Sequence, residues 1–437
     1  MPPILRLLTA LLALAASPAV FSAELRFLFG SASGRIDATQ LYDAARGYGF
    51  EPGATLTATP AAVTSTAPFY FSAAVPTEGT YRVTVTFPPG TDATVKAELR
   101  RLMVEHVVVP ADHPAVTRTF LVNTRTPQIP ATPATATAPA LAAGIVKLKA
   151  PRETTQEAWA WDNLLTLEFN GARPAVTALE LTPAPATPTL FLLGDSTVCD
   201  QSKEPYNSWG QMLPNWFQPD IAVANHGESG ETYRDSLGRR RLDKILSLMK
   251  PGDWLLMQFG HNDQKQIAQK TGAPFTTYQA EIKKHVDAVR LHGGTPLILS
   301  PMERRAFDAT GKVIPSLADY AAAARQSARE LGVAFIDLHA LSQPFYEALE
   351  SRGPAFSRHA FAGQDNTHHN NYGSYALSKL IVQAIRDQNL PLARHIVPAF
   401  QPLDPARPDD PAAFAVPASP NFSNQRPLGD DATRPRP

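Results

Sequence analysis

The sequence predicts a protein of two parts: an all-β region followed by an α/β region whose parallel sheet carries helices on both faces. Between Leu25 and about Thr182, short apolar runs are rich in β-branched and aromatic residues, and several alternate with polar residues as half-buried antiparallel strands do. From residue 189 onward, short apolar runs alternate with longer segments of helical period. Residues 183–188, which are prolines, alanines and a threonine, separate the two patterns and predict a stiff linker.

The first region, residues 24–182, is expected to form a β-sandwich. Turn signals such as residues 88–92 and 170–171 separate its strand candidates. The pattern resembles the galactose-binding-like jelly rolls, and residues 47–50 (Gly-Tyr-Gly-Phe) fit that resemblance. Residues 127–144, rich in Ala, Thr and Pro, predict a long surface loop. The strand candidates include 25–29, 68–71, 80–87 and 164–169.

The second region, residues 189–398, is expected to form a three-layer, flavodoxin-like fold with right-handed crossovers. We expect this region to fold without the sandwich, because a doubly wound sheet buries its own core. From residue 399 to 437 prolines recur without apolar periodicity, which predicts a tail that is disordered or lies on the surface. The expected strands are 190–193, 221–224, 254–259, 296–299 and 333–338, and the expected helices are 243–249, 278–291, 317–331 and 374–387.

Composition excludes several classes of protein. Lys plus Arg and Asp plus Glu each number 40, so no basic surplus points to nucleic acid or to an anionic membrane. The single cysteine, Cys199, cannot form an internal disulfide or a Cys-rich metal site. We interpret it as a small buried filler, with a reactive thiol as the alternative.

Residues 1–23 have the features of a secretory signal. Arg6 precedes an apolar run over residues 7–16, and small residues follow where cleavage would occur. The apolar run is too short to span a membrane, and no other segment approaches the length required. We therefore expect an exported protein, either periplasmic or extracellular.

Three short motifs carry chemistry. Ser196, in residues 193–197, lies just past an apolar strand, where open α/β sheets place their sites. Asp365 and His368 lie three positions apart near the end of the chain, and a serine, a histidine and an aspartate are the groups that covalent ester hydrolysis needs. Asn262, in residues 260–263, adds a carboxamide that can donate to a developing oxyanion.

Each of these residues also has a plainer interpretation. Ser196 can cap a helix, and Asn262 can brace loops. His368 and its neighbour His369 can be polar surface or metal ligands. A metal site is disfavoured because adjacent side chains rarely converge on one ion and no Glu or Cys lies nearby in the sequence. The presence of Ser196, Asp365 and His368 together favours the catalytic interpretation, while the Gly-x-Ser-x-Gly elbow of α/β-hydrolases is absent.

Together with residues 206–211 and 223–230, the motifs resemble the SGNH (GDSL-type) hydrolases. The Gly-Asp-Ser-Thr and Asp-x-x-His versions look most similar to the rhamnogalacturonan acetylesterase branch, and the resemblance covers roughly residues 189–389. The chain departs from that branch after the family's oxyanion glycine, where residues 231–234 are Glu-Thr-Tyr-Arg instead of an Arg followed by a Ser/Thr pair.

The resemblance implies a role for each motif residue. Ser196 is the expected nucleophile, His368 the base and Asp365 the group that orients the base. The expected oxyanion hole combines the backbone N–H groups of Ser196 and Gly230 with the side chain of Asn262.

The resemblance further implies an exported esterase that removes acetyl groups from an acetylated plant polysaccharide, namely pectic rhamnogalacturonan, without a metal or an organic cofactor. Acetylxylan, another acetylated glycan and a lipid ester are alternatives within the same class, and a catalytically inert glycan-binding protein is an alternative from another class. Trp209 and Tyr233 are candidates for stacking on sugar rings. The run of arginines at residues 239–241 is expected to be a solvated face.

Overall fold

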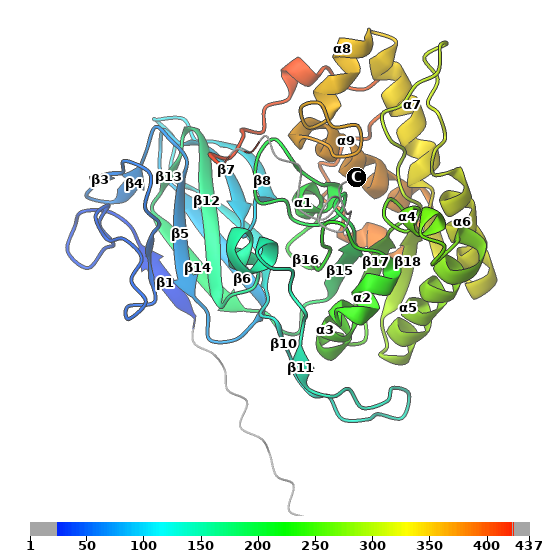
Figure 1. Ribbon diagram of the computed structural model, residues 1–437. Coiled ribbons are helices and arrows are strands. Elements are labelled where there is room, and N and C mark those ends of the chain that lie inside the picture. The colour runs from blue at the N-terminus through cyan, green and yellow to red at the C-terminus, as the bar shows by residue number, and fades with distance from the viewer. Residues whose placement is uncertain (1–23, 422, 424–437) are drawn as a thin grey trace, which may run out of the picture.

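The computed structural model describes residues 24–421 and 423, which form two parts lying side by side (Figure 1). The first part is built of antiparallel sheets, and the second is built on a parallel sheet that begins at residue 189. This architecture confirms the predicted mixed fold class. The predicted signal, residues 1–23, and the end of the tail, residues 424–437, lie outside the described residues.

The first part contains two larger antiparallel sheets that share one apolar core. Their strand orders are β1-β14-β6-β9 and β2-β5-β12-β7-β8, and β13, β4 and β3 form a smaller sheet. Successive side chains of a strand face opposite sides, so alternate residues such as Val83 and Val85 point inward, where they join Phe71 and Leu167 of the other sheet. The strands are β1 (Leu25–Leu28), β2 (Tyr48–Phe50), β3 (Thr57–Thr59), β4 (Ala62–Thr64), β5 (Phe69–Ala74), β6 (Gly79–Phe87), β7 (Asp92–Ala97), β8 (Arg101–Val108), β9 (Val116–Thr124), β12 (Leu164–Arg173), β13 (Ala175–Val176) and β14 (Ala178–Pro183).

The region predicted as a long surface loop forms an arm that projects from the lower edge of the molecule in Figure 1. Its base is a short antiparallel pair, β10 (Gln128–Ile129) with β11 (Gly144–Ile145). The ammonium of Lys244 donates to the carbonyl of Gln128, which attaches the base of the arm to the second part.

Five parallel strands form the sheet of the second part, in the order β16-β15-β17-β18-β19. The chain therefore extends first to one side of β15 and then to the other, as in flavodoxin-like sheets, and this reversal creates a switch point at the C-terminal end of β15. All five predicted strands are present, with bounds that differ by a few residues. They are β15 (Thr189–Gly194), β16 (Ala222–Asn225), β17 (Trp254–Gln258), β18 (Thr295–Leu299) and β19 (Ala334–Ile336).

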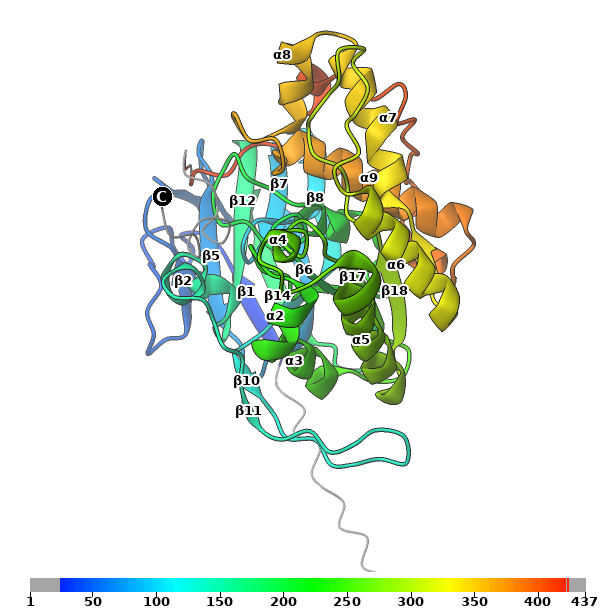
Figure 2. The ribbon, with the colours of Figure 1, turned by 45° about the vertical axis from the view of Figure 1, so that its right-hand side comes forward.

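Helices cover both faces of this sheet. Leu190 and Leu192 share a core with α1, α7 and α9 on one face, and the intervening Phe191 and Leu193 share a second core with α2, α3, α5 and α6 on the other. Figure 2 brings α2, α3 and α5 to the front. The helices are α1 (Trp209–Met212), α2 (Tyr233–Gly238), α3 (Arg241–Leu248), α4 (Lys265–Ala268), α5 (Gln279–Leu291), α6 (Ala318–Leu331), α7 (Leu338–Glu350), α8 (Pro354–Ser357) and α9 (Asn371–Asp387).

Helix α7 was not predicted, because Pro344 lies inside it. A proline removes one N–H from the helical ladder and usually ends a helix. Here Phe345, Tyr346 and Leu349 are fully buried in the core that they share with β18 and β19. Their burial stabilises the helix in spite of the proline.

The predicted linker is held at both ends. Pro183 is the last residue of β14, opposite Tyr81, and the amide of Ala184 donates to the carbonyl of Thr80 at 2.8 Å. At the other end, the carbonyl of Pro188 accepts from the amide of Ala222 at 2.9 Å. Backbone hydrogen bonds therefore tie one end of the connection to the antiparallel sheet and the other end to the parallel sheet.

Buried ion pairs join the two parts. Arg100, just before β8, reaches Glu204 at 2.5 Å in the second part, and Arg101, the first residue of β8, reaches Asp200 at 2.7 Å. The four side chains are at most 5% exposed. Removing one partner of a buried pair costs about 3–5 kcal/mol, because the remaining charge has no compensation. The two parts are thus energetically coupled.

A second buried group lies at the start of α3. Arg241 binds Glu153 of the first part at 2.5 Å and Glu231 of the second part at 2.7 Å, and none of the three is exposed. The prediction of a solvated arginine run is therefore wrong for Arg241, because carboxylates from both parts enclose its guanidinium. The indole N–H of Trp161 also donates to Glu153, at 2.9 Å, and completes this contact.

Of the two states predicted for the tail, residues 399–421 adopt the one that lies on the surface. Phe400 and Leu403 are buried in the core beside α9. Further along, the tail crosses to the first part (the red segment at the top of Figure 1), where the ammonium of Lys96 donates to the carbonyl of Pro417 at 2.7 Å and to Ser419 Oγ at 2.8 Å. Apolar anchors and hydrogen bonds thus hold the tail on the surface, although its sequence has no regular period.

We expect the second part not to reach its native state alone, in contrast to the independent folding that the sequence pattern suggested. A fragment starting at Thr187 leaves Asp200 and Glu204 without their arginines and Arg241 without Glu153. Several losses of about 3–5 kcal/mol each are comparable with a typical total stability of 5–15 kcal/mol. Near-UV circular dichroism and thermal unfolding of this fragment test the expectation. A native-like spectrum with a cooperative transition would contradict it.

Candidate active site

Ser196, His368 and Asp365 lie in one hydrogen-bonded row. Ser196 follows β15 at the switch point of the sheet, and the other two residues lie in the loop before α9. Ser196 Oγ is 2.8 Å from His368 Nε2, and His368 Nδ1 is 2.9 Å from Asp365 Oδ2. An imidazole nitrogen in this position can take the serine proton, while a carboxylate on the other nitrogen stabilises the imidazolium.

Asp365 is held by its own loop. Its Oδ1 accepts the backbone N–H groups of Thr367 at 2.7 Å and His368 at 3.0 Å. Burial by itself would raise the pKa of Asp365, but the hydrogen bond and charge of His368 and the two N–H groups outweigh burial and hold the pKa below its usual range. The carboxylate is therefore ionised when it faces the imidazole.

Asp195 joins the first motif to the second. Its Oδ1 accepts the amide of Thr197 at 3.0 Å and the Thr197 hydroxyl at 2.8 Å, and its Oδ2 is 3.2 Å from His261 Nδ1. Burial would raise the pKa of Asp195, but the charge and hydrogen bond of His261 lower it overall. The turn that carries Ser196 is thereby fastened to the loop that carries Asn262.

His369 faces away from the serine. Its Nε2 is 2.7 Å from the hydroxyl of Tyr346, and its ring lies against Tyr346 and Phe361. Burial lowers the pKa of His369 to about 3, with a further contribution from the neighbouring His368. Of the two adjacent histidines, His368 is thus the one that reaches Ser196, and His369 is a neutral core residue.

Ser196, Gly230 and Asn262 present N–H groups that are free to bind an anion. In the part of the chain that the structure describes, the amides of Ser196 and Gly230 have no hydrogen-bond acceptor. Asn262 Nδ2 uses one hydrogen on the carbonyl of Glu231, at 3.1 Å, and retains the other. Gly230 has a φ of 72°, a left-handed conformation that glycine adopts without strain.

Gln201 brings two of these groups together. Its Nε2 donates to the carbonyl of Ser196 at 2.7 Å and lies 3.3 Å from the hydroxyl of Ser229, the residue before Gly230. The backbone of the Gly230 loop therefore lies beside that of Ser196.

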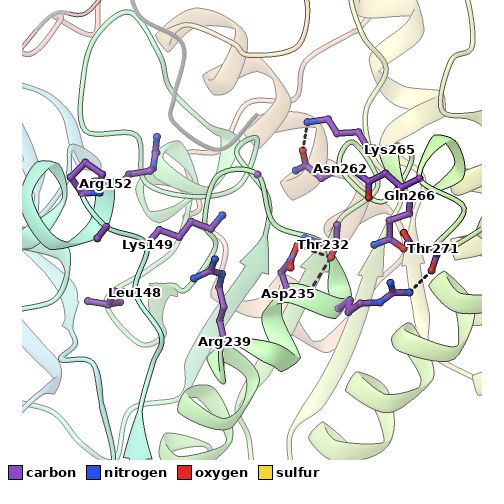
Figure 3. Close-up of a pocket in the computed structure, with 15 residues that line it drawn as sticks. Leu148, Lys149, Arg152, Thr232, Asp235, Arg239, Asn262, Lys265, Gln266 and Thr271 are labelled. Carbon is purple, nitrogen blue, oxygen red and sulfur yellow. Dashed lines mark hydrogen bonds between the residues drawn. The ribbon is translucent and has the colours of Figure 1, made fainter. Parts of the chain in front are cut away.

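A cavity of about 550 Å³ opens beside Gly230 and Asn262 (Figure 3). Residues 148–152 of the first part form one wall, and residues of α2 and α4 form the other. Figure 3 shows Lys149 and Arg239 on one side of the space and Asn262 and Lys265 on the other. Charged side chains in the lining are Lys149, Arg152, Arg234, Asp235, Arg239 and Lys265. Such a polar lining suits a sugar better than a long acyl chain.

The prediction that Trp209 and Tyr233 stack on sugar is wrong, because both side chains are buried. Trp209 is 1% exposed and donates its indole N–H to Gln258 at 2.8 Å. Tyr233 is fully buried, with its ring against Phe259. Both aromatics pack the core on which the site rests and cannot reach a polysaccharide.

Two lysines of the cavity were not predicted as site residues. Lys265 lies three residues after Asn262, a helical spacing that could have indicated the contact. Lys149 had no such signal, because it comes from the first part and meets the site only through the packing of the two parts.

Cys199 is buried, and burial raises the pKa of its thiol well above the usual value. This environment is that of an unreactive filler.

Among residues 24–421 and 423, no group of three or more His, Cys, Asp or Glu side chains is placed to hold a metal ion. Over the same residues, no helix has the length and apolar character needed to cross a bilayer.

Comparison with known proteins identifies the class. The GDSL-like lipase/acylhydrolase family matches residues 192–376. Rhamnogalacturonan acetylesterase RhgT of Bacillus subtilis (strain 168) is 34% identical over 223 residues, which are 48% of this chain and 94% of the relative. The rhamnogalacturonan acetylesterase of Emericella nidulans is 24% identical over 236 residues, 48% of this chain and 90% of the relative. The chain belongs to the GDSL-like lipase/acylhydrolase family and is a carboxylic ester hydrolase.

Among solved structures, protein YxiM from Bacillus subtilis is similar over a longer stretch. The similarity covers 84% of this chain and 99% of that chain, with 22% sequence identity and a TM-score of 0.46.

The burial of His369 leads to a test by pH. The folded chain keeps this imidazole neutral down to about pH 3, whereas the unfolded chain binds a proton below about pH 6.5. Lowering the pH therefore decreases the free energy of unfolding of the wild-type protein through His369, and this contribution is absent from His369→Ala. The difference in unfolding free energy between the two should shrink by about 2 kcal/mol from pH 7 to pH 5, at 1.36 kcal/mol per pH unit. Urea unfolding at both pH values measures it, and an unchanged difference would contradict the buried neutral state.

Proposed function

We propose that this protein is an exported carbohydrate esterase that removes acetyl groups from acetylated rhamnogalacturonan through an acetyl-enzyme on Ser196. The row from Ser196 through His368 to Asp365 is the observation that carries the proposal. The family supports it, because ester hydrolysis by a serine needs these three groups in this order of contact.

In the first half-reaction, Ser196 Oγ attacks the acetyl carbonyl carbon while His368 Nε2 takes its proton. The carbonyl oxygen becomes an oxyanion, which the N–H groups of Ser196, Gly230 and Asn262 bind. The carbon–oxygen bond to the sugar then breaks, and the imidazolium of His368 protonates the departing sugar alkoxide.

In the second half-reaction, water replaces the sugar. His368 takes a proton from the water as its oxygen attacks the acetyl-enzyme, and the same N–H groups bind the second oxyanion. Release of acetate breaks the bond to Ser196 Oγ, which recovers its proton from His368. Asp365 remains an anion throughout and stabilises the imidazolium.

The names of the relatives support rhamnogalacturonan as the substrate, because two proteins that share the hydrolase half of the chain are named for that activity. Acetylxylan and other acetylated glycans are the alternatives within this class. The polar lining of the cavity favours any of these over a lipid ester. Export is proposed from the signal-like residues 1–23.

A glycan-binding protein with an inert hydrolase half is the alternative from another class. An inert descendant is expected to lose one of its catalytic groups, and here Ser196, Asn262, Asp365 and His368 are all present. The short contacts within the row also support activity.

Ser196→Ala should lower turnover of p-nitrophenyl acetate by roughly a thousand-fold or more, as loss of a triad member does elsewhere. The substitution removes one oxygen and should leave the near-UV spectrum unchanged. Acetate release from acetylated rhamnogalacturonan, measured in parallel with acetylxylan, tests the substrate. A variant that keeps more than about a tenth of the wild-type rate would rule out Ser196 as the nucleophile, since uncatalysed hydrolysis is far slower.

His368→Ala and His369→Ala form a matched pair of adjacent substitutions. The first should abolish turnover to the same extent as Ser196→Ala, because it removes the base. The second should retain most of the turnover and instead lower thermal stability, because it removes the partner of Tyr346. Steady-state rates and melting temperatures of both variants decide between the two histidines, and an inactive, stable His369→Ala would reverse the assignment.

A further inference from the structure

Two lysines donate to the oxygen ends of the two amides that carry proposed oxyanion donors. Lys149 Nζ donates to the carbonyl of Ser229, which belongs to the peptide group whose N–H is that of Gly230. Lys265 Nζ donates to Asn262 Oδ1 at 2.8 Å. We propose that Lys149 and Lys265 are positioning residues that orient and polarise the oxyanion hole, one through each amide. This inference rests on the acyl-transfer mechanism proposed above.

The planar peptide bond transmits the effect of Lys149. In a trans peptide, the C=O and the N–H point in opposite directions. A hydrogen bond from Lys149 to the Ser229 oxygen therefore directs the Gly230 N–H to the opposite side of the peptide plane. Without Lys149, this peptide can rotate more freely, because the flanking Gly230 has no side chain to restrict it.

The side-chain amide of Asn262 is held in the same way. Its oxygen accepts from Lys265, and one hydrogen of its Nδ2 is donated to the carbonyl of Glu231 at 3.1 Å. An exchange of the amide oxygen and nitrogen would place an N–H₂ group against the ammonium and an oxygen against a carbonyl. The two contacts thus leave one N–H of Asn262 in a fixed direction.

Charge adds to orientation. An ammonium at the oxygen end of an amide polarises the group and strengthens its N–H as a donor, because hydrogen bonds in series reinforce one another. The nearest carboxylate to Lys149 is that of Glu231, at 3.9 Å, which Arg241 already binds at 2.7 Å. The side chain of Lys149 is only 17% exposed, so little solvent screens its charge. The stabilisation is greatest when the oxyanion forms, and it should therefore act on kcat more than on KM.

Lys149 comes from the first part of the chain, in the segment after β11, and Lys265 begins α4. The first part therefore contributes to the catalytic machinery itself. In the relatives RhgT and the Emericella nidulans enzyme, the matched regions span nearly the whole protein but only 48% of this chain. Lys149 lies outside residues 192–376, the part of the chain that the family matches.

The test uses Lys149→Met and Lys265→Met in the full chain, with Lys147→Met as the matched control. Lys147 lies two residues from Lys149, is exposed and does not line the cavity. With p-nitrophenyl acetate, we expect each of the first two variants to lower kcat roughly ten- to hundred-fold, less than the loss of a whole oxyanion donor, with KM changed by less than about three-fold. Lys147→Met should behave as wild type.

A double-substitution cycle separates positioning from general damage to the fold. In an Asn262→Ala background, Lys265→Met should have almost no further effect, because the amide that it orients is gone. Lys149→Met should retain its full effect in that background, because it acts through the Ser229–Gly230 peptide. Additive effects of Lys265→Met and Asn262→Ala would overturn the proposal for Lys265. A rate loss for Lys149→Met that disappears when Asn262 is absent would overturn it for Lys149.

Other outcomes bear on the proposal as a whole. If the lysines instead bind an acidic group of the polysaccharide, the variants will hydrolyse p-nitrophenyl acetate at the wild-type rate and show a raised KM on the polymer only, which overturns the positioning role. If Ser196→Ala is inactive while both lysine variants keep the wild-type kcat, this inference fails and the proposed mechanism survives. If Ser196→Ala is active, the proposed mechanism itself is wrong. Near-UV spectra and melting temperatures ensure that only folded variants are compared.

Discussion

The fully buried guanidinium of Arg241 is the interaction on which the arrangement of the molecule depends. It binds Glu153 of the first part and Glu231 of the second, and Glu231 follows the glycine of the proposed oxyanion hole. Buried ions are costly to remove from water and are stable only when every partner is in place. This requirement fixes the two parts relative to each other within narrow limits, and with them the loop that carries Gly230. Glu231, the first residue at which the chain departs from the family pattern, is thus a partner of Arg241.

The site consequently lies at a junction of segments that are distant in the chain. The switch point of the parallel sheet supplies Ser196, and the loop before α9 supplies Asp365 and His368. Asp195 fastens the serine turn to the loop of Asn262, while residues 148–152 of the first part close one wall of the cavity. Catalytic geometry must be held to fractions of an ångström, and contacts from several rigid elements provide that precision better than a single loop can. The first part thus helps to hold the geometry of the site in addition to lying beside it.

Local patterns predicted much of the fold. The strands of the parallel sheet and four of its helices are within a few residues of their predicted positions, because each is defined by an apolar period that the sequence displays directly. Helix α7 was missed because Pro344 has a strong local effect that burial of Phe345 and Tyr346 overcomes. The contacts of the linker and of the tail could not be predicted for a related reason. Both segments are rich in proline and have no apolar period, so the sequence does not indicate the contacts with distant strands that hold them in place.

The sequence by itself determined the fold class, the membership of an ester hydrolase family and the identity of Ser196, Asn262, Asp365 and His368 as candidates, because these depend on short motifs and regular periods. Only the tertiary structure decided that His369 is a buried partner of Tyr346, that Trp209 and Tyr233 are core residues, and that Arg241 is buried between two carboxylates. It also brought Lys149 to the oxyanion loop. The physical reason is that burial and the choice of partner depend on contacts between residues that are distant in the sequence. Such contacts produce no regular pattern along the chain.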